Sequence, residues 1–261
     1  MSVLSYLNNR ASTAVLSETE RTSINTSIST LGLRLDQYFT TDGDKLSKHF
    51  RFGSSTRSTI LPRSIDPSSD VDYMVVFEKG GLTPQSYIDR LKRFAEKKYS
   101  SSEIYQSSPT IVLELNHIRF DLVPALNEYG AFYKIPNGPA TWRQSNPNDF
   151  NTDLEKLNKD NSYLLKPTIR LAKIWNVTGS NGRVFDSFAF EKWIKDRSFW
   201  GCSNQTEYLF TVFDNLSANT DTQWRNDRIL RAKELIANIR RYEKEDMPIT
   251  AESEMKKLIP E

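Results

Sequence analysis

Strand and helix patterns occupy different parts of this chain, and this separation constrains its fold more than any other feature. Runs with the alternation of β-strands lie before residue 125, whereas helical periodicity dominates after residue 148. Strands followed by helices are typical of α+β proteins. We therefore expect an α+β lobe over residues 1–148 and an α-helical lobe over 149–261, with the active site in the cleft between them.

A long helix is expected near the N-terminus, and apolar residues at spacings of four and three mark its core-facing side. These residues are Ile24, Ile28, Leu31, Leu35 and Tyr38. Ser17, followed three residues later by Glu20, matches a capping box and places the start of the helix. The polar residues 40–50 predict a loop after it.

The rest of the first lobe is expected to contain strands, one helix and an irregular connection. Alternation predicts a strand from Val71 to Phe77, and Thr83-Pro84 opens a helix. Residues 110–115 and 118–123 predict a hairpin, whereas the prolines and glycines of 127–148 predict a connecting segment. The helices expected in the second lobe span 149–160, 162–177, 186–197, 205–218 and 222–245.

Composition argues against several classes of protein. A single cysteine, Cys202, cannot form an internal disulfide, and with only His49 and His117 beside it a Cys/His zinc site is not expected. No apolar run reaches the roughly 20 residues of a membrane helix, and the N-terminus lacks a signal-peptide pattern, so we expect a soluble cytoplasmic protein. The net charge of +2 predicts no nucleic-acid groove, and the basic residues of 225–241 predict a solvated helix face.

Three aspartates stand out against apolar strands. Asp70 and Asp72 flank Val71 at the start of a predicted strand, so their carboxylates project from one face about 7 Å apart. Asp121 lies in a later, otherwise apolar strand, where a carboxylate is costly unless it is paired or bound to metal. Three converging carboxylates predict a site for two Mg²⁺ ions, the arrangement that phosphoryl and nucleotidyl transfer commonly uses.

Each of these signals is weak alone. An Asp-x-Asp pair occurs often by chance, and Asp121 could simply form an ion pair with Arg119 or Arg63. Upstream, however, Gly53-Ser54 predicts a tight turn whose backbone amides can approach an anion. A Gly-Ser turn, an Asp-x-Asp strand and a third Asp on a later strand form a specific combination in that order.

These segments resemble a known family. The runs GSSTRSTILPRSIDPSSDVDYMVVF and RFDLVPAL, followed by LLKPTIRLAKIWN and DSFAFEKWI, are similar to the nucleotidyltransferase core of oligoadenylate synthetases, cyclic GMP-AMP synthase and bacterial CD-NTases. The CD-NTases are the cyclic-oligonucleotide synthases of antiphage defence. The resemblance covers roughly residues 50–195 and implies a DNA-polymerase-β-like fold, with a mixed sheet and helices followed by a helical lobe.

The resemblance also implies roles for the three aspartates and the Gly-Ser turn. Gly53 and Ser54 would hold the triphosphate of the donor nucleotide. Asp70 and Asp72 would each bind both Mg²⁺ ions, for which Mn²⁺ is a substitute. Asp121 would bind the catalytic ion and orient or deprotonate the attacking ribose hydroxyl.

Three residues of the second lobe match family positions that contact phosphates. Lys173 matches a lysine on the donor triphosphate, and Arg170 matches a residue near the acceptor's phosphates. Ser187 matches a serine that also reaches the triphosphate. Alternatively, Arg170 could pair with a surface acid, and Ser187 could be a helix cap.

The chain departs from the animal members of this family. The stretch between Ser55 and Asp70 is longer than in oligoadenylate synthetases and contains Pro62 and Pro67, which puts the acceptor-side contacts in doubt. It also has no zinc insertion of the Cys/His kind. These departures favour the bacterial branch, without a nucleic-acid activator.

The expected function is therefore Mg²⁺-dependent synthesis of a cyclic di- or trinucleotide messenger from nucleoside triphosphates: ATP, GTP or pyrimidine nucleotides. We expect a monomer whose product is recognised by a downstream effector, with no membrane partner. One alternative is a linear or tailing nucleotidyltransferase acting on RNA, tRNA or protein. Another is a catalytically idle nucleotide-binding regulator.

Overall fold

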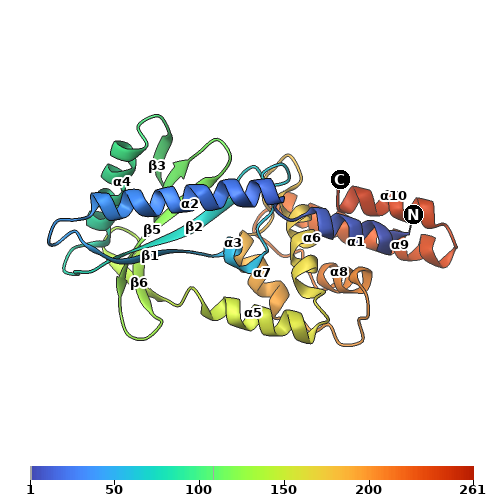
Figure 1. Cartoon of the computed structure of the whole chain (residues 1–261). Helices are drawn as coiled ribbons and strands as arrows, with labels where there is room; N and C mark the ends of the chain where they lie inside the picture. The colour runs from blue at the N-terminus through green and yellow to red at the C-terminus, as the bar shows by residue number, and fades with distance from the viewer. Residues whose placement is uncertain (1, 108) are drawn as a thin grey trace. The chain divides into compact units, whose positions relative to one another are not determined.

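The computed structural model describes residues 2–107 and 109–261, which divide into two compact units (Figure 1). The sheet unit contains residues 16–63 and 68–153, and the helical unit contains residues 2–15, 64–67 and 154–261. The expected division at 148/149 thus differs in its N-terminal part, because the first 15 residues pack with the C-terminal helices.

Within the described residues of the sheet unit, seven strands form one mixed sheet. The strand order is β1-β2-β5-β4-β3, and the β6–β7 hairpin pairs with the end of β5. Only the β2–β5 pair is parallel among these described pairings. The strands are β1 Leu46–Phe52, β2 Asp70–Phe77, β3 Glu103–Ser107, β4 Thr110–Glu114, β5 Arg119–Asn127, β6 Tyr133–Asn137 and β7 Thr141–Ser145.

Helices α2 (Glu18–Tyr38) and α4 (Pro84–Lys98) cover one face of this sheet. Both helices were expected from the sequence and are confirmed. Ser17 and Glu20 form the predicted capping box, in which each side chain accepts from the other residue's backbone N–H, and Thr83 caps α4.

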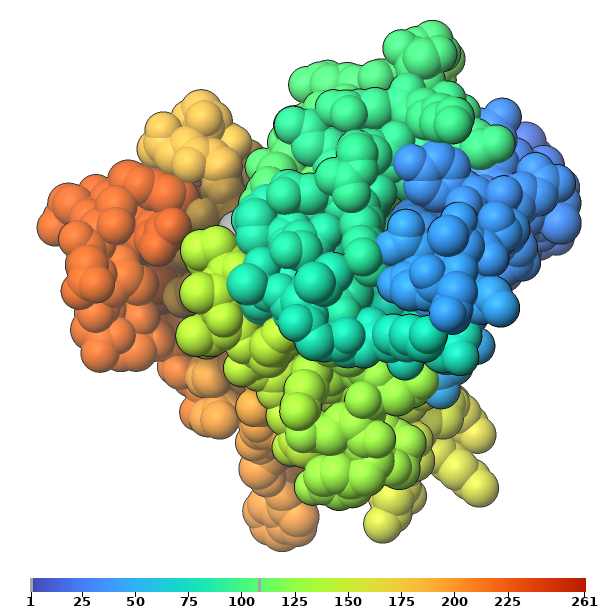
Figure 2. All heavy atoms as spheres, turned by 90° about the vertical axis from the view of Figure 1, so that its left-hand side faces the viewer, coloured from blue at the N-terminus to red at the C-terminus, as the bar shows by residue number. Residues whose placement is uncertain are grey.

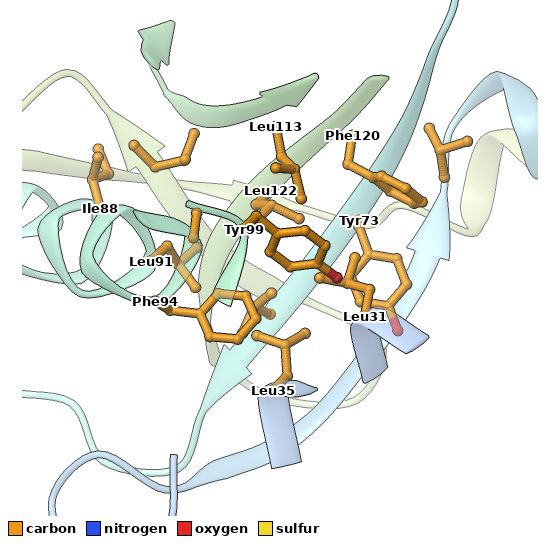
Figure 3. Packing of buried hydrophobic residues seen from close by; sticks show 14 of the residues in the cluster. Leu31, Leu35, Tyr73, Ile88, Leu91, Phe94, Tyr99, Leu113, Phe120 and Leu122 are labelled. Carbon is orange, nitrogen blue, oxygen red and sulfur yellow. The ribbon is translucent and has the colours of Figure 1, made fainter. Parts of the chain in front are cut away.

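The main core fills the space between these helices and the sheet (Figure 3). Side chains from three sources interlock there, and the largest are aromatic. They are Leu31 and Leu35 from α2, Leu91 and Phe94 from α4, and Tyr73, Leu113, Phe120 and Leu122 from the strands.

Two segments expected to be irregular are strands. Residues 46–52 form β1, which pairs with β2 alone among the described strands. Because an edge strand has one side exposed to water, it carries polar residues, and these interrupt the apolar alternation that predicts a strand. The predicted connection 127–148 contains the β6–β7 hairpin, in which Pro136 lies opposite Trp142 of β7 and beyond the two β6 residues that pair with β5.

One end of the sheet unit is held by ion pairs between loops and α4. Arg90 of α4 lies 2.9 Å from Asp44, and Lys79 lies 2.8 Å from Asp42. In Figure 2 the segment around α4 (teal) lies against the loop that follows α2 (blue). This is the end at which β2 reaches Phe77, whose ring lies beneath the Arg90 guanidinium.

The helical unit is built around α6, which is buried on nearly all sides. Helix α1 is bonded to the C-terminal end of the chain: the Tyr6 hydroxyl donates to the Ile259 carbonyl at 2.5 Å, and Arg10 Nε donates to the Pro260 carbonyl at 2.6 Å. In the described chain, no helix combines the length and apolar character needed to cross a membrane. The helices are α1 Val3–Thr13, α6 Leu165–Val177, α7 Ser187–Lys195, α8 Gln205–Asp214, α9 Gln223–Lys244 and α10 Pro248–Leu258.

The five helices predicted after residue 148 are all present. Helix α5 (Asp149–Asp160) has the predicted ends and begins in the sheet unit, whereas at least one end of each of the other four is shifted. The basic face predicted on α9 is only partly solvated. Arg231 pairs with Glu234 at the surface, but Arg228 is half-buried and donates to the Trp175 carbonyl. Arg228 therefore packs α9 against α6.

Candidate active site

Four charged side chains share one face of the sheet where β2 and β5 begin. The parallel register places Asp70 beside Arg119 and Asp72 beside Asp121. Because alternate residues of a strand point to the same face, all four side chains project together. Val71 and Phe120 point into the main core on the opposite face and are fully buried. The sheet therefore brings together the three carboxylates that the sequence singled out.

Apolar side chains continue this face toward the other end of both strands. Met74 and Val76 follow Asp72 on β2, and Val123 and Ala125 follow Asp121 on β5. They form a small buried cluster with the β6 strand and Phe50. The aspartates thus stand at the border between a packed apolar layer and solvent.

Arg119 bridges two of the three aspartates. Its Nε donates to Asp121 Oδ1 at 2.8 Å, and its Nη2 donates to Asp121 Oδ2 at 3.1 Å and to Asp70 Oδ2 at 3.3 Å. Burial lowers the pKa of Arg119, but the hydrogen bond and charge of Asp121, aided by Asp70, outweigh it and raise that pKa above its ordinary value. The ion pair between Asp121 and Arg119 considered from the sequence is present. Arg63 instead lies 3.4 Å from Glu114.

The Gly-Ser turn lies against the third aspartate. Gly53 ends β1 and precedes the short helix α3 (Ser54–Arg57), with φ 73° and ψ −155°, a conformation open almost only to glycine. A Cβ at this position would lie 1.8 Å from Asp72 Oδ2. Glycine is therefore required twice, for the backbone angle and for the room that the carboxylate takes.

The aspartates suit hard divalent cations, although they are not yet arranged around one. Carboxylate oxygens are the ligands that Mg²⁺ and Mn²⁺ prefer. Among residues 2–107 and 109–261, no three Asp, Glu, His or Cys side chains converge closely enough to hold a metal ion. The Arg119 guanidinium lies between Asp70 and Asp121 and satisfies with its own charge the need for a cation there. The donor set fits Mg²⁺ once this arginine moves.

The predicted phosphate-contacting residues belong to the helical unit. Lys173 and Arg170, about one turn apart on α6, are both buried. Arg170 Nη2 donates to the Ala11 carbonyl of α1 at 3.2 Å, and burial lowers the pKa of Arg170 to about 10. The Arg170 side chain is therefore shielded from solvent, and both interpretations of its role stay predictions.

Ser187 is the first residue of α7 and not its cap. The cap is Asp186, whose Oδ1 accepts from the backbone N–H of Ala189 at 2.8 Å. The helix-cap alternative for Ser187 is therefore wrong. Its contact with phosphate, like those of Arg170 and Lys173, stays a prediction.

The sequence indicates Arg119 only as an ion-pair partner of Asp121, not as a partner of Asp70. Arg119 stands two residues before Asp121, a spacing that places both on one face of a strand. That signal was available, but the link to Asp70 depends on the register between β2 and β5.

The sequence of this chain matches the model of a known protein family. The family model described as "Second Messenger Oligonucleotide or Dinucleotide Synthetase domain" matches residues 1–158. No curated protein sequence matches the chain significantly.

Several solved structures are similar over nearly the whole chain. CdnC from E. coli MS115-1, solved with ATP, is 16% identical with a TM-score of 0.70, covering 100% of this chain and 98% of that chain. Vibrio cholerae DncV, a cyclic AMP-GMP synthase solved with the linear intermediate pppA(3′,5′)pG, is 12% identical with a TM-score of 0.70, covering 99% and 96%. CdnE from Elizabethkingia meningoseptica, a cyclic dinucleotide synthase solved with GTP and Apcpp, is 17% identical with a TM-score of 0.64, covering 87% and 89%. At these identities the likeness establishes the fold, and the predicted α+β class is confirmed.

Proposed function

Because the chain belongs to the family of second messenger oligonucleotide or dinucleotide synthetase domains, we propose that it joins nucleoside triphosphates into a cyclic di- or trinucleotide. The 2′- or 3′-hydroxyl of one nucleotide attacks the α-phosphorus of another. A new O–P bond forms, the bond to the β-phosphate oxygen breaks, and pyrophosphate leaves. A second attack within the linear product closes the ring.

The observation that carries this proposal is the parallel register of β2 and β5. It sets Asp72 beside Asp121, with Asp70 two residues before Asp72 on the same face and Gly53 packed against Asp72. Three carboxylates next to a glycine turn are suited to charge neutralisation around a triphosphate. A nucleotide-binding module without chemistry has no need to hold three like charges together, which weighs against an idle regulator.

Two Mg²⁺ ions, or Mn²⁺ in their place, would be held by Asp70, Asp72 and Asp121. When bound, such ions neutralise phosphate charge and lower the pKa of a coordinated hydroxyl. Asp121 accepts the proton of the attacking hydroxyl on a carboxylate oxygen. Backbone N–H groups at Gly53 and Ser54 donate to the donor's phosphates. Lys173 and Ser187 add contacts to the donor triphosphate, and Arg170 adds one to the acceptor's phosphates.

The biological setting is part of the same proposal. Solved relatives with ATP and with GTP support nucleoside triphosphates as substrates. The messenger would be read by a downstream effector in antiphage signalling. The enzyme would act as a cytoplasmic monomer and need no nucleic-acid activator.

The test is product analysis with the purified chain. All four labelled ribonucleoside triphosphates and Mg²⁺ should yield pyrophosphate and a product that keeps all its phosphates after phosphatase treatment, because a ring has no terminal phosphate. Products from which phosphatase removes terminal phosphates would favour the linear alternative. Asp70→Asn, Asp72→Asn and Asp121→Asn should each lower turnover by more than about 10²-fold. Asp44→Asn, at the far end of the sheet, is the matched control and should keep turnover. Full activity in Asp70→Asn and Asp72→Asn would refute the site.

A further inference from the structure

Two of the three aspartates share one cationic partner in this structure, the side chain of Arg119. Both carboxylate oxygens of Asp121 accept hydrogen bonds from Arg119, and Oδ2 of Asp70 accepts a third. A guanidinium presents its N–H groups as a rigid planar fork, which matches a carboxylate at two points. Arg119 thus uses the oxygens that a metal ion would need.

We propose that Arg119 is an internal counter-cation of the active site, which holds Asp70 and Asp121 in the metal-free protein and competes with divalent cations for them. This inference rests on the proposed function, since it assumes that these aspartates bind metal. It adds that metal binding is an exchange of one cation for another. Arg119 is a positioning residue in this scheme.

Electrostatics explains why such a residue is useful. Three carboxylates on one face of a sheet repel one another, and burial strengthens that repulsion. Arginine keeps its charge at any working pH, so it neutralises the group without depending on the supply of metal. The side chains of Arg119, Asp70 and Asp121 are only 21%, 26% and 14% exposed. Water therefore screens the repulsion between the two carboxylates poorly.

The neighbouring strand offers Arg119 an alternative partner. Glu114 of β4 lies directly opposite Arg119 in the β4–β5 register. Directly opposed residues of a sheet carry their Cβ atoms about 5 Å apart, within reach of a long side chain. Glu114 already pairs with Arg63 at 3.4 Å, and it can share a second cation. Arg119 can therefore leave the aspartates without becoming an isolated charge.

A consequence for binding order follows. Without nucleotide, a divalent ion gains only what remains after Arg119 has been displaced, so it binds weakly. A triphosphate supplies further oxygen ligands to the ion and a new anionic partner for the released guanidinium. The site therefore binds metal chiefly when the nucleotide substrate is present.

The test measures Mn²⁺ binding to the purified chain without nucleotide, by calorimetry or by the loss of the free-ion electron paramagnetic resonance signal. Arg119→Gln should bind Mn²⁺ about tenfold more tightly than the parent, the factor that corresponds to one charge-assisted hydrogen bond. In chelator, the same variant should unfold at a lower temperature, because the carboxylates lose their counter-ion. Neither readout requires turnover.

Arg90→Gln is the matched control. Arg90 forms an ion pair with Asp44 in the same unit, and its side chain is 19% exposed, close to the value for Arg119. It lies near Phe77, at the other end of β2 from Asp70. Its loss should lower the unfolding temperature while leaving the Mn²⁺ affinity unchanged.

Arg119→Lys keeps the test decisive if the glutamine variant does not fold. A single ammonium cannot bridge two carboxylates as a fork does, so this variant should also bind Mn²⁺ more tightly than the parent. Variants at 119 that bind Mn²⁺ no more tightly than the parent would overturn the proposal for Arg119 alone. A parent that binds no Mn²⁺ even with a non-hydrolysable nucleoside triphosphate would overturn the metal site, and this inference with it.

Discussion

A carbon atom added to Gly53 would lie 1.8 Å from Oδ2 of Asp72, less than the length of any non-bonded contact. The turn that is expected to hold the triphosphate and the strand that carries the aspartates are therefore packed against each other without spare room. A change in one displaces the other.

Gly53→Ala should disable the site and weaken the fold. Alanine must leave the φ of 73° or push Asp72 aside, so we expect a loss of about 1–3 kcal/mol in unfolding free energy and a fall in turnover above about 10²-fold. Denaturant unfolding and pyrophosphate release measure the two effects. Gly130→Ala is the control, because its φ is 59° and no atom lies within 4 Å of the new carbon. Equal losses of turnover in both variants would contradict the role of the Asp72 contact.

Asp121→Asn should destabilise the metal-free protein. An amide cannot accept two charge-assisted hydrogen bonds from Arg119, so we expect a loss of about 1–2 kcal/mol in chelator. Thermal unfolding in EDTA checks this value. Asp42→Asn, which removes the exposed pair with Lys79, should cost less than about 0.5 kcal/mol. An unchanged stability of Asp121→Asn would mean that the Arg119 bridge contributes nothing.

Tyr73→Phe should reduce the alkaline sensitivity of folding. Burial raises the pKa of Tyr73 from 10.0 to about 12, so between these values the unfolded chain loses its proton first and stability falls as pH rises. Two pKa units correspond to about 2–3 kcal/mol over that window. Unfolding free energies from pH 9 to 11.5 should fall less steeply in Tyr73→Phe than in the parent. The variant also loses the 2.7 Å hydrogen bond to His49, which lowers stability at every pH. In Tyr129→Phe, at an exposed tyrosine, the unfolding free energy should fall with pH as steeply as in the parent. An equally steep fall in Tyr73→Phe would show that Tyr73 does not cause the alkaline loss of stability.

Tyr6→Phe should loosen the C-terminal helix of the helical unit. The buried Tyr6 hydroxyl donates to the Ile259 carbonyl, and its removal leaves that acceptor unsatisfied at a cost of about 1–3 kcal/mol. Amide hydrogen exchange over α10 should quicken. Ser12→Ala, which removes an exposed hydroxyl bonded within α1, should leave that exchange unchanged. Protection of α10 that survives Tyr6→Phe would show that the bond does not hold the helix.

The sequence was informative where one local rule decides the structure. Ser17 and Glu20 place the start of α2 because a capping box is satisfied by four residues alone. The aspartates were found because a carboxylate in an apolar strand is costly wherever that strand lies. Neither inference needed a partner strand.

Other features escaped because they depend on distant residues. β1 pairs only with β2 among the described strands, and its Lys48 and His49 show no apolar alternation. The bridge from Arg119 to Asp70 joins residues 49 positions apart and exists only in one register. The grouping of α1 with the C-terminal end of the chain involves the hydrogen bonds from Tyr6 to Ile259 and from Arg10 to Pro260, whose partners are 253 and 250 residues apart and leave no local pattern in the sequence.

The parallel pairing of β2 and β5 also bears on how such a chain can change over time. Main-chain hydrogen bonds fix which residues stand side by side, so loops outside these strands can lengthen or shorten without moving the aspartates. Inserting or deleting one residue inside either strand would instead turn half of the acidic group toward the apolar core. Divergence should therefore accumulate by substitution within these strands and by changes of length between them.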